Sequence, residues 1–309
     1  MTFNVRHILP TELTAFAQIT DRPQSIERFS HMVTTMWDSG ESKPAWCFVI
    51  ENEGQLLGRI GYMTLDGRAD AVTIFGWTLP WDDDYLVLGT ELLAKSVAIL
   101  RQQGVQTIQR ELYSVWGTLN AQRETLEAAG FGELQAQCVY ELAAAGSQVN
   151  VPTRLQFKSL AEVGEVRFCE LIQQATAGTP DRGIQQLIEQ VGLEQFVIDS
   201  NHMLAAEHDV LDDWWCVAFS ADKPIGFIQP VQFKNSTEGN IAYLGVLPDM
   251  RGNGYGFDLL AAGTAKLLEA GIELIIGRTD TDNIPMQRTF EKLGYQLESR
   301  VWTYEHRNS

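Results

Sequence analysis

Cysteine is scarce in this sequence, and no two cysteines have CxxC spacing. The four cysteines are Cys47, Cys138, Cys169 and Cys216. Their scatter argues against a disulfide framework and against the usual cysteine-based zinc sites, so we expect reduced thiols. The five histidines show no metal-ligand spacing either, and we expect His202 and His208 to lie in a solvated turn. The sequence therefore predicts no metal centre.

Basic residues are also few. The chain has 23 Lys and Arg against 40 Asp and Glu, which gives a formal net charge of −17 and a pI of about 4.7. Binding to nucleic acid or to an anionic membrane surface needs clustered cations, so the composition argues against both partners. An acidic chain instead suits a cationic substrate such as an amine.

Long apolar segments are absent too. No run of about 18 apolar residues occurs, so we expect no membrane-spanning helix. Residues 1–7 lack the apolar core of a signal peptide. From these absences we expect a soluble, cytoplasmic protein without a membrane partner.

What the sequence does contain is an internal repeat. Its 309 residues are long for one compact domain and fit two of about 150 residues. Residues 46–60 and 215–228 each hold two apolar runs around a polar turn, as β-hairpins do, at an offset of 169 residues. Gly130-Phe131 and Gly294-Tyr295 repeat at an offset of 164 residues. The sequence thus predicts a tandem duplication. The predicted domains are residues 1–145 and 152–309, joined by a small, polar linker.

The stretch Ile241–Leu268 carries the clearest chemical signal. Ile241–Leu247 is an apolar run closed by Pro248, which predicts a central strand. Arg251-Gly-Asn-Gly-Tyr-Gly256 follows, and apolar residues then recur at helical spacing from Phe257. Glycines at such a junction let consecutive backbone N–H groups converge at a helix N-terminus. That arrangement forms a seat for an anion such as a pyrophosphate.

Two other interpretations of this turn are open. The glycines could serve only to relieve steric strain in a tight strand-to-helix connection. The loop of a dinucleotide-binding fold fits less well, because its spacing is G-x-G-x-x-G, whereas Gly252, Gly254 and Gly256 alternate.

A second motif follows on the C-terminal side. A strand-like run, Ile272–Ile276, leads into the polar stretch Thr279–Asn283. A helix then carries Met286 and Phe290 and ends at Gly294-Tyr295.

The two motifs together resemble those of the GNAT superfamily of N-acetyltransferases. The first family motif runs V-x-P-x-x-R-G-x-G-x-G, which Val246–Gly256 matches. The second runs N-x-x-(small or Met)-x-x-x-(Tyr)-x-x-x-G-(Phe/Tyr), and the residues from Asn283 to Tyr295 match it except at Phe290. Two motifs in the right order are more specific than either alone.

The resemblance implies an α/β (α+β) fold with two tandem GNAT-like domains, each a mixed, mostly antiparallel sheet flanked by helices. It also implies acetyl-CoA as the cofactor. The loop would hold the pyrophosphate, and Asn283 would bind the pantetheine or adenine-side arm. A β-bulge near Gly245 would present a backbone N–H to the thioester carbonyl. The implied cofactor-binding residues are Leu244, Val246, Arg251, Gly252, Asn253, Gly254, Tyr255, Gly256, Asn283 and Phe290.

Phe290 departs from the family pattern. Many relatives carry a tyrosine here, whose hydroxyl is taken to protonate the departing thiolate, and phenylalanine has no such proton. Tyr243, Tyr255 and Tyr304 are the alternatives for that role. As general base we select Glu238, acting through a water molecule. The competing interpretation of Glu238 is an ordinary turn carboxylate.

The first repeat lacks the glycine-rich loop. When Pro80 is aligned with Pro248, the residues opposite the loop include Asp82, Asp83 and Asp84. Negative side chains would repel a pyrophosphate, by roughly 1–4 kcal/mol for like charges about 4 Å apart. We therefore expect the first copy to have lost cofactor binding and to serve as a scaffold or substrate wall.

These inferences predict an acetyl-CoA-dependent N-acetyltransferase that acts on a primary amine of a small molecule or peptide. The alternative, favoured by Phe290, is a non-catalytic, CoA-binding regulatory protein. Both interpretations require the cofactor loop, so turnover distinguishes them.

Overall fold

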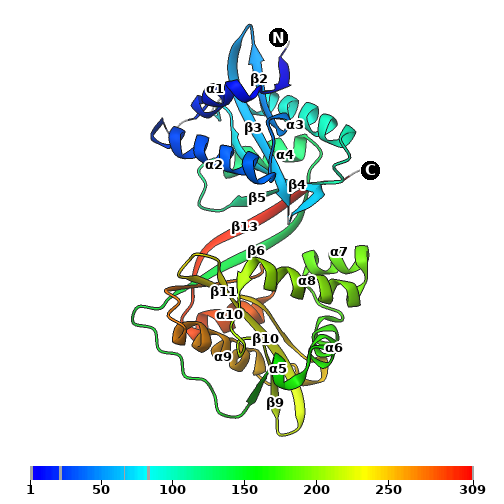
Figure 1. The fold of residues 1–309 in the computed structure, drawn as a ribbon, viewed down its shortest axis with the longest axis vertical. Helices are drawn as coiled ribbons and strands as arrows, with labels where there is room; N and C mark the ends of the chain where they lie inside the picture. The colour runs from blue at the N-terminus through cyan, green and yellow to red at the C-terminus, as the bar shows by residue number, and fades with distance from the viewer. Residues whose placement is uncertain (1–2, 21–22, 66, 82–83, 308–309) are drawn as a thin grey trace. The chain divides into compact units, whose positions relative to one another are not determined.

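The computed structural model of the chain describes residues 3–20, 23–65, 67–81 and 84–307. The chain forms two compact units, which Figure 1 shows as a ribbon. Unit 1 comprises Met1–Leu134 and Val301–Ser309, and unit 2 comprises Gln135–Arg300.

Unit 1 combines a mixed sheet with helices. Its elements are β1 (Asn4–His7), α1 (Leu13–Gln18), α2 (Ile26–Ser39), β2 (Cys47–Asn52), β3 (Gln55–Leu65), β4 (Arg68–Thr78), α3 (Tyr85–Gln102), β5 (Thr107–Tyr113), α4 (Leu119–Ala128) and the end of β13 (Gln296–Arg307). The strand order is β1-β2-β3-β4-β5-β13. β4 and β5 run parallel, and the other neighbours are antiparallel.

Unit 2 repeats this plan. Its elements are β6 (Gly132–Ala143), β7 (Gln156–Ser159), α5 (Leu160–Val163), α6 (Glu165–Thr176), α7 (Arg182–Val191), α8 (Leu193–Glu207), β8 (His208–Asp209), β9 (Cys216–Ser220), β10 (Lys223–Phe233), β11 (Glu238–Val246), α9 (Tyr255–Glu269), β12 (Leu274–Asp280) and α10 (Ile284–Leu293). The strand order is β6-β12-β11-β10-β9-β7, and β8 pairs with β10. β11 and β12 are parallel, and the other neighbouring strands in this order are antiparallel.

Helices cover both faces of the unit 1 sheet. Phe48 of β2 belongs to the same core as Leu92 of α3. Its neighbour Val49 packs in a separate core with Val33 of α2. Successive side chains of a strand point to opposite faces, so a strand buried on both sides reads as one apolar run. This explains the unbroken apolar pattern of β2.

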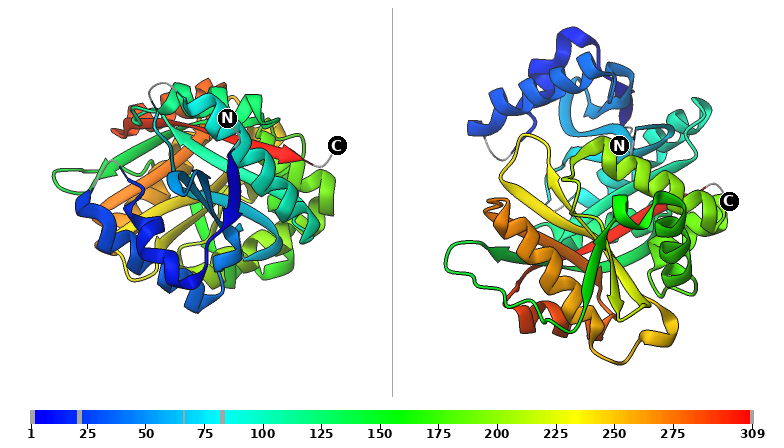
Figure 2. Two further views of the ribbon diagram at one scale, coloured as in Figure 1. Left: turned by 90° about the horizontal axis from the view of Figure 1, so that it is seen from above. Right: turned by 60° about the horizontal axis from the view of Figure 1, so that its bottom comes forward.

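The unit 2 sheet is covered in the same way. The ring of Phe227 in β10 packs on Phe168 of α6, and a Cβ on neighbouring Gly226 would meet Leu259 of α9. α6 and α9 therefore lie on opposite faces, as Figure 1 and the right panel of Figure 2 show, with α9 in orange and α6 in green. The predicted fold class, mixed and mostly antiparallel sheets flanked by helices, is confirmed.

The two units divide the chain at residues other than the predicted ones. The sequence predicts domains at 1–145 and 152–309. In the structure, the boundaries between the units along the chain fall after Leu134 and after Arg300. The cause is strand pairing: β6 pairs with β12, and Val301–Arg307 pairs with β5. Most of the last strand of each repeat thus belongs to the unit formed mainly by the other repeat. A sequence pattern locates a strand, but hydrogen-bond partners decide which sheet it joins.

Two further findings bear on the expectations from composition. Among the described residues, no helix combines the length and the hydropathy needed to cross a bilayer. The four cysteines are free thiols, and Cys47, Cys138 and Cys216 are buried.

Candidate active site

β11 and β12 separate along their length. They are paired over only three positions, Glu238–Asn240 against Leu274–Ile276, and no further pairing joins them within the described residues. β11 continues to Val246 and β12 to Asp280, so an opening forms between two strands that began as neighbours. We call this opening the unit 2 wedge. Because strand N–H and C=O groups point alternately to either side, part of the backbone of β11 faces the wedge without a strand partner.

A β-bulge lies at Ala242, not near Gly245 as predicted. Ile241 pairs with Pro230 and Tyr243 pairs with Gln229, which leaves Ala242 as the extra residue. Proline has no N–H to donate to the ladder, so a bulge opposite it costs little hydrogen bonding. The prediction missed this because the deciding proline belongs to the neighbouring strand.

Gly245 has a different reason to be glycine. It is in regular register with Phe227, whose ring would lie 2.7 Å from a Cβ at position 245. The next contact of such a Cβ would be Ala175 of α6, at 3.1 Å. Gly245 therefore permits close packing of β11 against α6. The half-buried segment Tyr243–Val246, which contains the predicted Leu244 and Val246, forms one edge of the wedge.

The predicted anion seat lies directly after this segment. Gly252 and Gly254 have φ angles of 80° and 75°, the left-handed region that favours glycine. Gly254 is the N-cap of α9, and as a glycine it has no side chain with which to cap that terminus. A Cβ on Gly252 or Gly256 would meet nothing within 4 Å, so the loop borders open space. Exposed N–H groups at a helix N-terminus suit the charge and size of a pyrophosphate, so the loop fits acetyl-CoA.

Arg251 and Asn253 hold the loop in shape. Nε of Arg251 donates to the Val246 carbonyl at 3.1 Å, and a terminal nitrogen donates to the Ala175 carbonyl at 2.9 Å. Nδ2 of Asn253 donates to the carbonyls of Met250 and Arg251, each at 3.1 Å. These bonds join the loop to the ends of β11 and α6. Part of the donor capacity of Arg251 is thereby used within the protein.

Arg154, which was not predicted from the sequence, also lies at the loop. Its Nε donates to Asp258 Oδ2 at 2.5 Å, and a terminal nitrogen donates to the Asn253 carbonyl at 3.2 Å. Its guanidinium carbon lies 4.6 Å from the ring centroid of Tyr255, within the range of a cation–π contact. No local pattern marks Arg154, because it precedes Asp258 by 104 residues.

Tyr243 presents a hydroxyl group on the splayed part of β11. Its OH lies 2.8 Å from Oγ1 of Thr176, the last residue of α6. Burial raises the pKa of this hydroxyl to about 12, so it stays protonated at neutral pH.

Two carboxylates gather near the open end of the wedge. Asp280 ends β12, and burial, together with the charge of Asp181, raises the pKa of its carboxyl group. Nε2 of Gln135 donates to Asp280 Oδ1 at 2.6 Å and to Asp181 Oδ1 at 3.2 Å. The charge of Asp181 also acts on the hydroxyl of Tyr243, after the larger effect of burial. The polar run after a buried strand was a signal for Asp280, whereas nothing local marks Asp181 or Gln135.

Comparison with known proteins connects this geometry with a family. Residues 185–295, all within unit 2, match the profile described as the acetyltransferase (GNAT) family. The match covers about a third of the chain, so it marks part of unit 2 as similar to the GNAT family.

Solved structures share the fold along the whole chain. A GCN5-related N-acetyltransferase from Sphaerobacter thermophilus matches 99% of this chain and 95% of its own, with a TM-score of 0.65 and 14% identity. A tandem GNAT protein from the clavulanic acid biosynthesis pathway matches 99% of this chain and 98% of its own, with a TM-score of 0.55 and 12% identity. At such identities the likeness concerns the fold, and it includes a protein with two GNAT units.

One curated relative is similar over a short stretch. Mycothiol acetyltransferase of Corynebacterium aurimucosum is 35% identical over 66 residues, which are 21% of this chain and 22% of that protein. The match therefore spans less than a quarter of the relative's length.

The second GNAT motif lies along α10. Asn283 is the N-cap of this helix, and its Oδ1 accepts a hydrogen bond from the Met286 N–H at 3.3 Å. Phe290 is only 2% exposed, stacks on Tyr140 with ring centroids 5.0 Å apart, and meets Tyr295 edge to face. The structure thus places Phe290 in the core of unit 2, whereas the loop Arg251–Gly256, the GNAT loop, is largely exposed.

Glu238 lies at the other end of β11 from the loop. It is the first residue of the strand and is exposed, and its N–H donates to Ser236 Oγ in the preceding turn. Val246 is eight residues further on, or roughly 26 Å along an extended strand. The structure therefore does not bring Glu238 together with the GNAT loop.

The three alternative tyrosines lie in different places. Tyr304 is buried in unit 1, where its hydroxyl bonds to Arg123 and Glu127. Tyr255 is the first residue of α9, beside the loop. Tyr243 alone among these three lies on the open segment of β11.

The corresponding turn of unit 1 lies between β4 and α3. Asp82 and Asp83 are outside the described residues, and Asp84 occupies the N-cap position of α3 without capping it through its side chain. The helix keeps a buried apolar face. Its residues include Leu92, Leu93, Val97 and Leu100.

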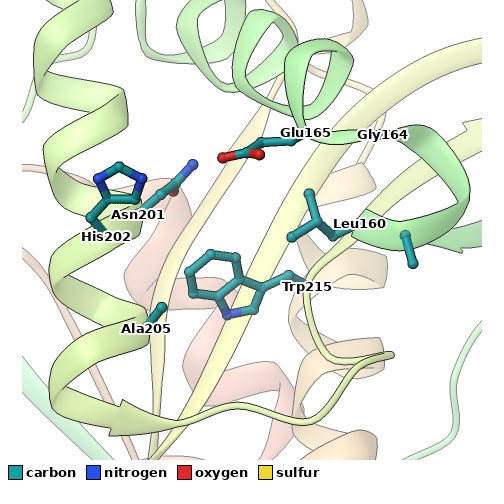
Figure 3. Close-up of a pocket in the computed structure, with 8 residues that line it drawn as sticks. Leu160, Gly164, Glu165, Asn201, His202, Ala205 and Trp215 are labelled. Carbon is teal, nitrogen blue, oxygen red and sulfur yellow. The ribbon is translucent and has the colours of Figure 1, made fainter.

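A pocket of about 480 Å³ opens elsewhere in unit 2 (Figure 3). The indole of Trp215 forms one wall, and Glu165 of α6 and His202 of α8 lie on other sides, as Figure 3 shows. The lining residues come from α5, α6, α8, the short links at their ends and Trp215, so the pocket is separate from the GNAT loop.

Proposed function

We propose that unit 2 transfers an acetyl group from acetyl-CoA to a primary amine of a small molecule or peptide. One observation carries the proposal: β11 and β12 separate directly before an uncapped, glycine-rich turn at the N-terminus of α9. A thioester arm can enter between the strands while its pyrophosphate lies on the turn. The match of residues 185–295 to the GNAT family profile supports acyl transfer as the reaction class.

Acetyl transfer requires a group that accepts a proton from the amine, a hydrogen-bond donor to the oxyanion and a proton donor to the sulfur. The amine nitrogen bonds to the acetyl carbon, the carbon–sulfur bond breaks, the amine loses a proton and the sulfur gains one. In this proposal backbone N–H groups of the open segment of β11 donate to the carbonyl oxygen, where negative charge develops.

The side chains near the wedge supply the proton transfers. Tyr243, protonated because burial raises the pKa of its hydroxyl to about 12, holds the proton for the departing sulfur. Asp280 replaces Glu238 as the preferred general base, because it lies at the open end of β12 and a raised pKa makes its carboxylate a better proton acceptor. Asp181 adds negative charge that attracts a cationic amine.

The N-terminal copy has a supporting role in this proposal. Without a glycine-rich turn, unit 1 binds no acetyl-CoA, so the chain binds one molecule. Free, mostly buried cysteines fit a reducing compartment such as the cytoplasm.

The test combines calorimetric titration of acetyl-CoA with a thiol-release assay on the intact chain. The assay uses polyamines, aminoglycosides, amino acids and peptide N-termini as acceptors. We expect micromolar binding at a stoichiometry near one, and thiol release with at least one class of amine. Absence of binding would refute the proposal, and a stoichiometry near two would refute the silent first copy.

A CoA-binding protein without turnover is the second candidate function. Phe290 favours it, because the residue offers no proton at the position where many relatives carry tyrosine. Binding without thiol release across the whole amine panel would support this candidate over the enzyme.

A further inference from the structure

We propose that Arg154, which lies between β6 and β7 of unit 2, is a direct ligand of the acyl donor's pyrophosphate. The inference rests on the proposed function, since it concerns the same loop. It assigns a phosphate-binding role to a residue that lies outside both family motifs.

The position of the guanidinium is the first argument. A terminal nitrogen of Arg154 donates to the Asn253 carbonyl and would lie 3.5 Å from a Cβ on Gly254, the N-cap of α9. The cation therefore lies beside the backbone N–H groups that form the anion seat. Its side chain is 49% exposed, so a ligand in solution can reach Arg154.

The distribution of hydrogen-bond donors is the second argument. A guanidinium has five N–H donors, and the contacts to Asp258 and Asn253 use two of those on Arg154. The remaining donors suit phosphate oxygens, which arginine binds through a planar fork. Arg251, by contrast, directs its side chain back to the carbonyls of Val246 and Ala175.

The surroundings hold Arg154 in this place. The carboxylate of Asp258 is 3% exposed and fixes Nε at 2.5 Å, and the ring of Tyr255 lies under the guanidinium. A side chain fixed by a buried partner loses less conformational freedom when a ligand binds. Arg154 also neutralises the charge of Asp258 through their ion pair. Without that pairing, the carboxylate of Asp258 in the first turn of α9 would repel a bound anion.

The test compares CoA with two ligands that carry parts of it: dephospho-CoA keeps the pyrophosphate but lacks the 3′-phosphate, and pantetheine lacks the adenosine and every phosphate. Calorimetric titration of CoA, dephospho-CoA and pantetheine into the intact chain and Arg154→Ala gives three affinities for each protein. We expect the substitution to weaken CoA and dephospho-CoA equally, by about ten- to a hundredfold, as loss of a charge-assisted hydrogen bond does. Pantetheine affinity should change less than threefold. Arg167→Ala, which removes an equally exposed arginine of unit 2, is the matched control and should bind all three ligands normally.

A second pair of variants separates direct contact from neutralisation of Asp258. If Arg154 only neutralised Asp258, the double variant Arg154→Ala, Asp258→Asn would regain normal CoA affinity. Under direct contact the double variant stays weak, and it also removes the unpaired buried charge that could unfold the single variant.

Each outcome decides the question. Unchanged CoA affinity in Arg154→Ala, equal losses for CoA and pantetheine, or full recovery in the double variant would overturn the proposal. A loss confined to CoA, with dephospho-CoA unaffected, would also overturn it by placing Arg154 on the 3′-phosphate. Absence of CoA binding by the unchanged chain would refute the proposed function itself.

Discussion

The parallel strand pairs of the two units begin alike and end differently. In unit 1, Ala71–Thr73 pairs with Thr107–Gln109, and in unit 2 the pairing of β11 with β12 likewise covers three positions. Beyond Gln109, the side chain of Arg110 reaches back across the opening and donates to the Ile74 carbonyl at 2.8 Å. It also donates to Gln122 at 3.2 Å. In unit 1 an arginine side chain thus spans the space between the diverging strands, and in unit 2 the corresponding space stays open.

The residue in the matching position of unit 2 is Gly277. It is the first residue after the last paired position of β12, as Arg110 is in β5. A Cβ on Gly277 would lie 2.3 Å from the ring of Phe290, so this glycine is required by core packing. The position whose side chain spans the opening in unit 1 therefore carries no side chain in unit 2.

This comparison shows how two copies of one fold can differ in chemistry. Even in unit 1 a pocket of about 380 Å³ remains beside Arg110, with Tyr113 and Trp116 in its wall. What that unit lacks is a glycine-rich turn before its helix. The fold supplies the divergent strands, and under the proposed function the glycine-rich turn decides whether a unit can bind acetyl-CoA.

The largest expected effect comes from a charge on the loop of unit 2. Gly256→Asp places a carboxylate in the first turn of α9, where a Cβ meets nothing and the helix dipole favours negative charge. The fold should remain intact, while acetyl-CoA affinity falls on the order of 100-fold, because nearby like charges repel by roughly 1–4 kcal/mol. Calorimetric titration measures this loss.

Gly256→Ala is the control for this variant. It adds the Cβ without charge and should melt at an equal or higher temperature, because alanine favours helix over glycine by about 1 kcal/mol. Its acetyl-CoA affinity should stay close to normal. Persistent tight binding by Gly256→Asp would contradict the comparison and direct attention to unit 1.

A catalytic difference should appear at Tyr243. Tyr243→Phe should lower kcat by about 100-fold and change KM little, because the proton for sulfur is lost. The hydroxyl stays protonated below its pKa of about 12, so the unchanged enzyme should show no alkaline fall in kcat up to about pH 10. Steady-state kinetics across pH tests both statements. An unchanged kcat in Tyr243→Phe would exclude Tyr243 as the acid.

The bridge in unit 1 should matter for stability. Arg110→Met loses the bonds to Ile74 and Gln122, which should destabilise unit 1 by about 1–3 kcal/mol. Chemical denaturation measures that loss. Acetyl-CoA stoichiometry should remain near one, because the glycine-rich turn is still missing. A second equivalent of bound acetyl-CoA would show that the Arg110 bridge, and not the missing glycine-rich turn, prevents unit 1 from binding acetyl-CoA.

The smallest effect is expected at Phe290. Phe290→Tyr places a hydroxyl in a packed core where its para carbon faces Gly277, which should cost about 1–2 kcal/mol of stability. Because the ring is buried among Tyr140 and Tyr295, kcat should not rise. A clear gain in kcat would instead place position 290 at the reacting sulfur.

Contiguous features of the site could be predicted from the sequence. Strand, turn and helix follow one another from β11 through α9, so apolar spacing and glycines were sufficient to locate them. The pattern of α10 was equally local, and its N-cap is Asn283.

Features that join distant residues could not be predicted. The pair of Arg154 and Asp258 spans 104 residues, and that of Gln135 and Asp280 spans 145. The bulge at Ala242 depends on a proline in the neighbouring strand. Glu238 was chosen for its charge, but the direction of β11 places it far from the loop. In each case the feature depends on which distant segments become neighbours in the tertiary structure, and a local sequence pattern does not reveal that.

The exchange of end strands has a consequence for the order in which the protein forms. Unit 2 is continuous, from Gln135 to Arg300, whereas the sheet of unit 1 needs Val301–Arg307 beside β5. A ribosome releases β5 long before it makes those residues, so this edge of the first-made unit must wait unpaired. The copy that is synthesised first is therefore completed last. A chain that stops near residue 150 cannot represent unit 1, because its sheet would lack that strand.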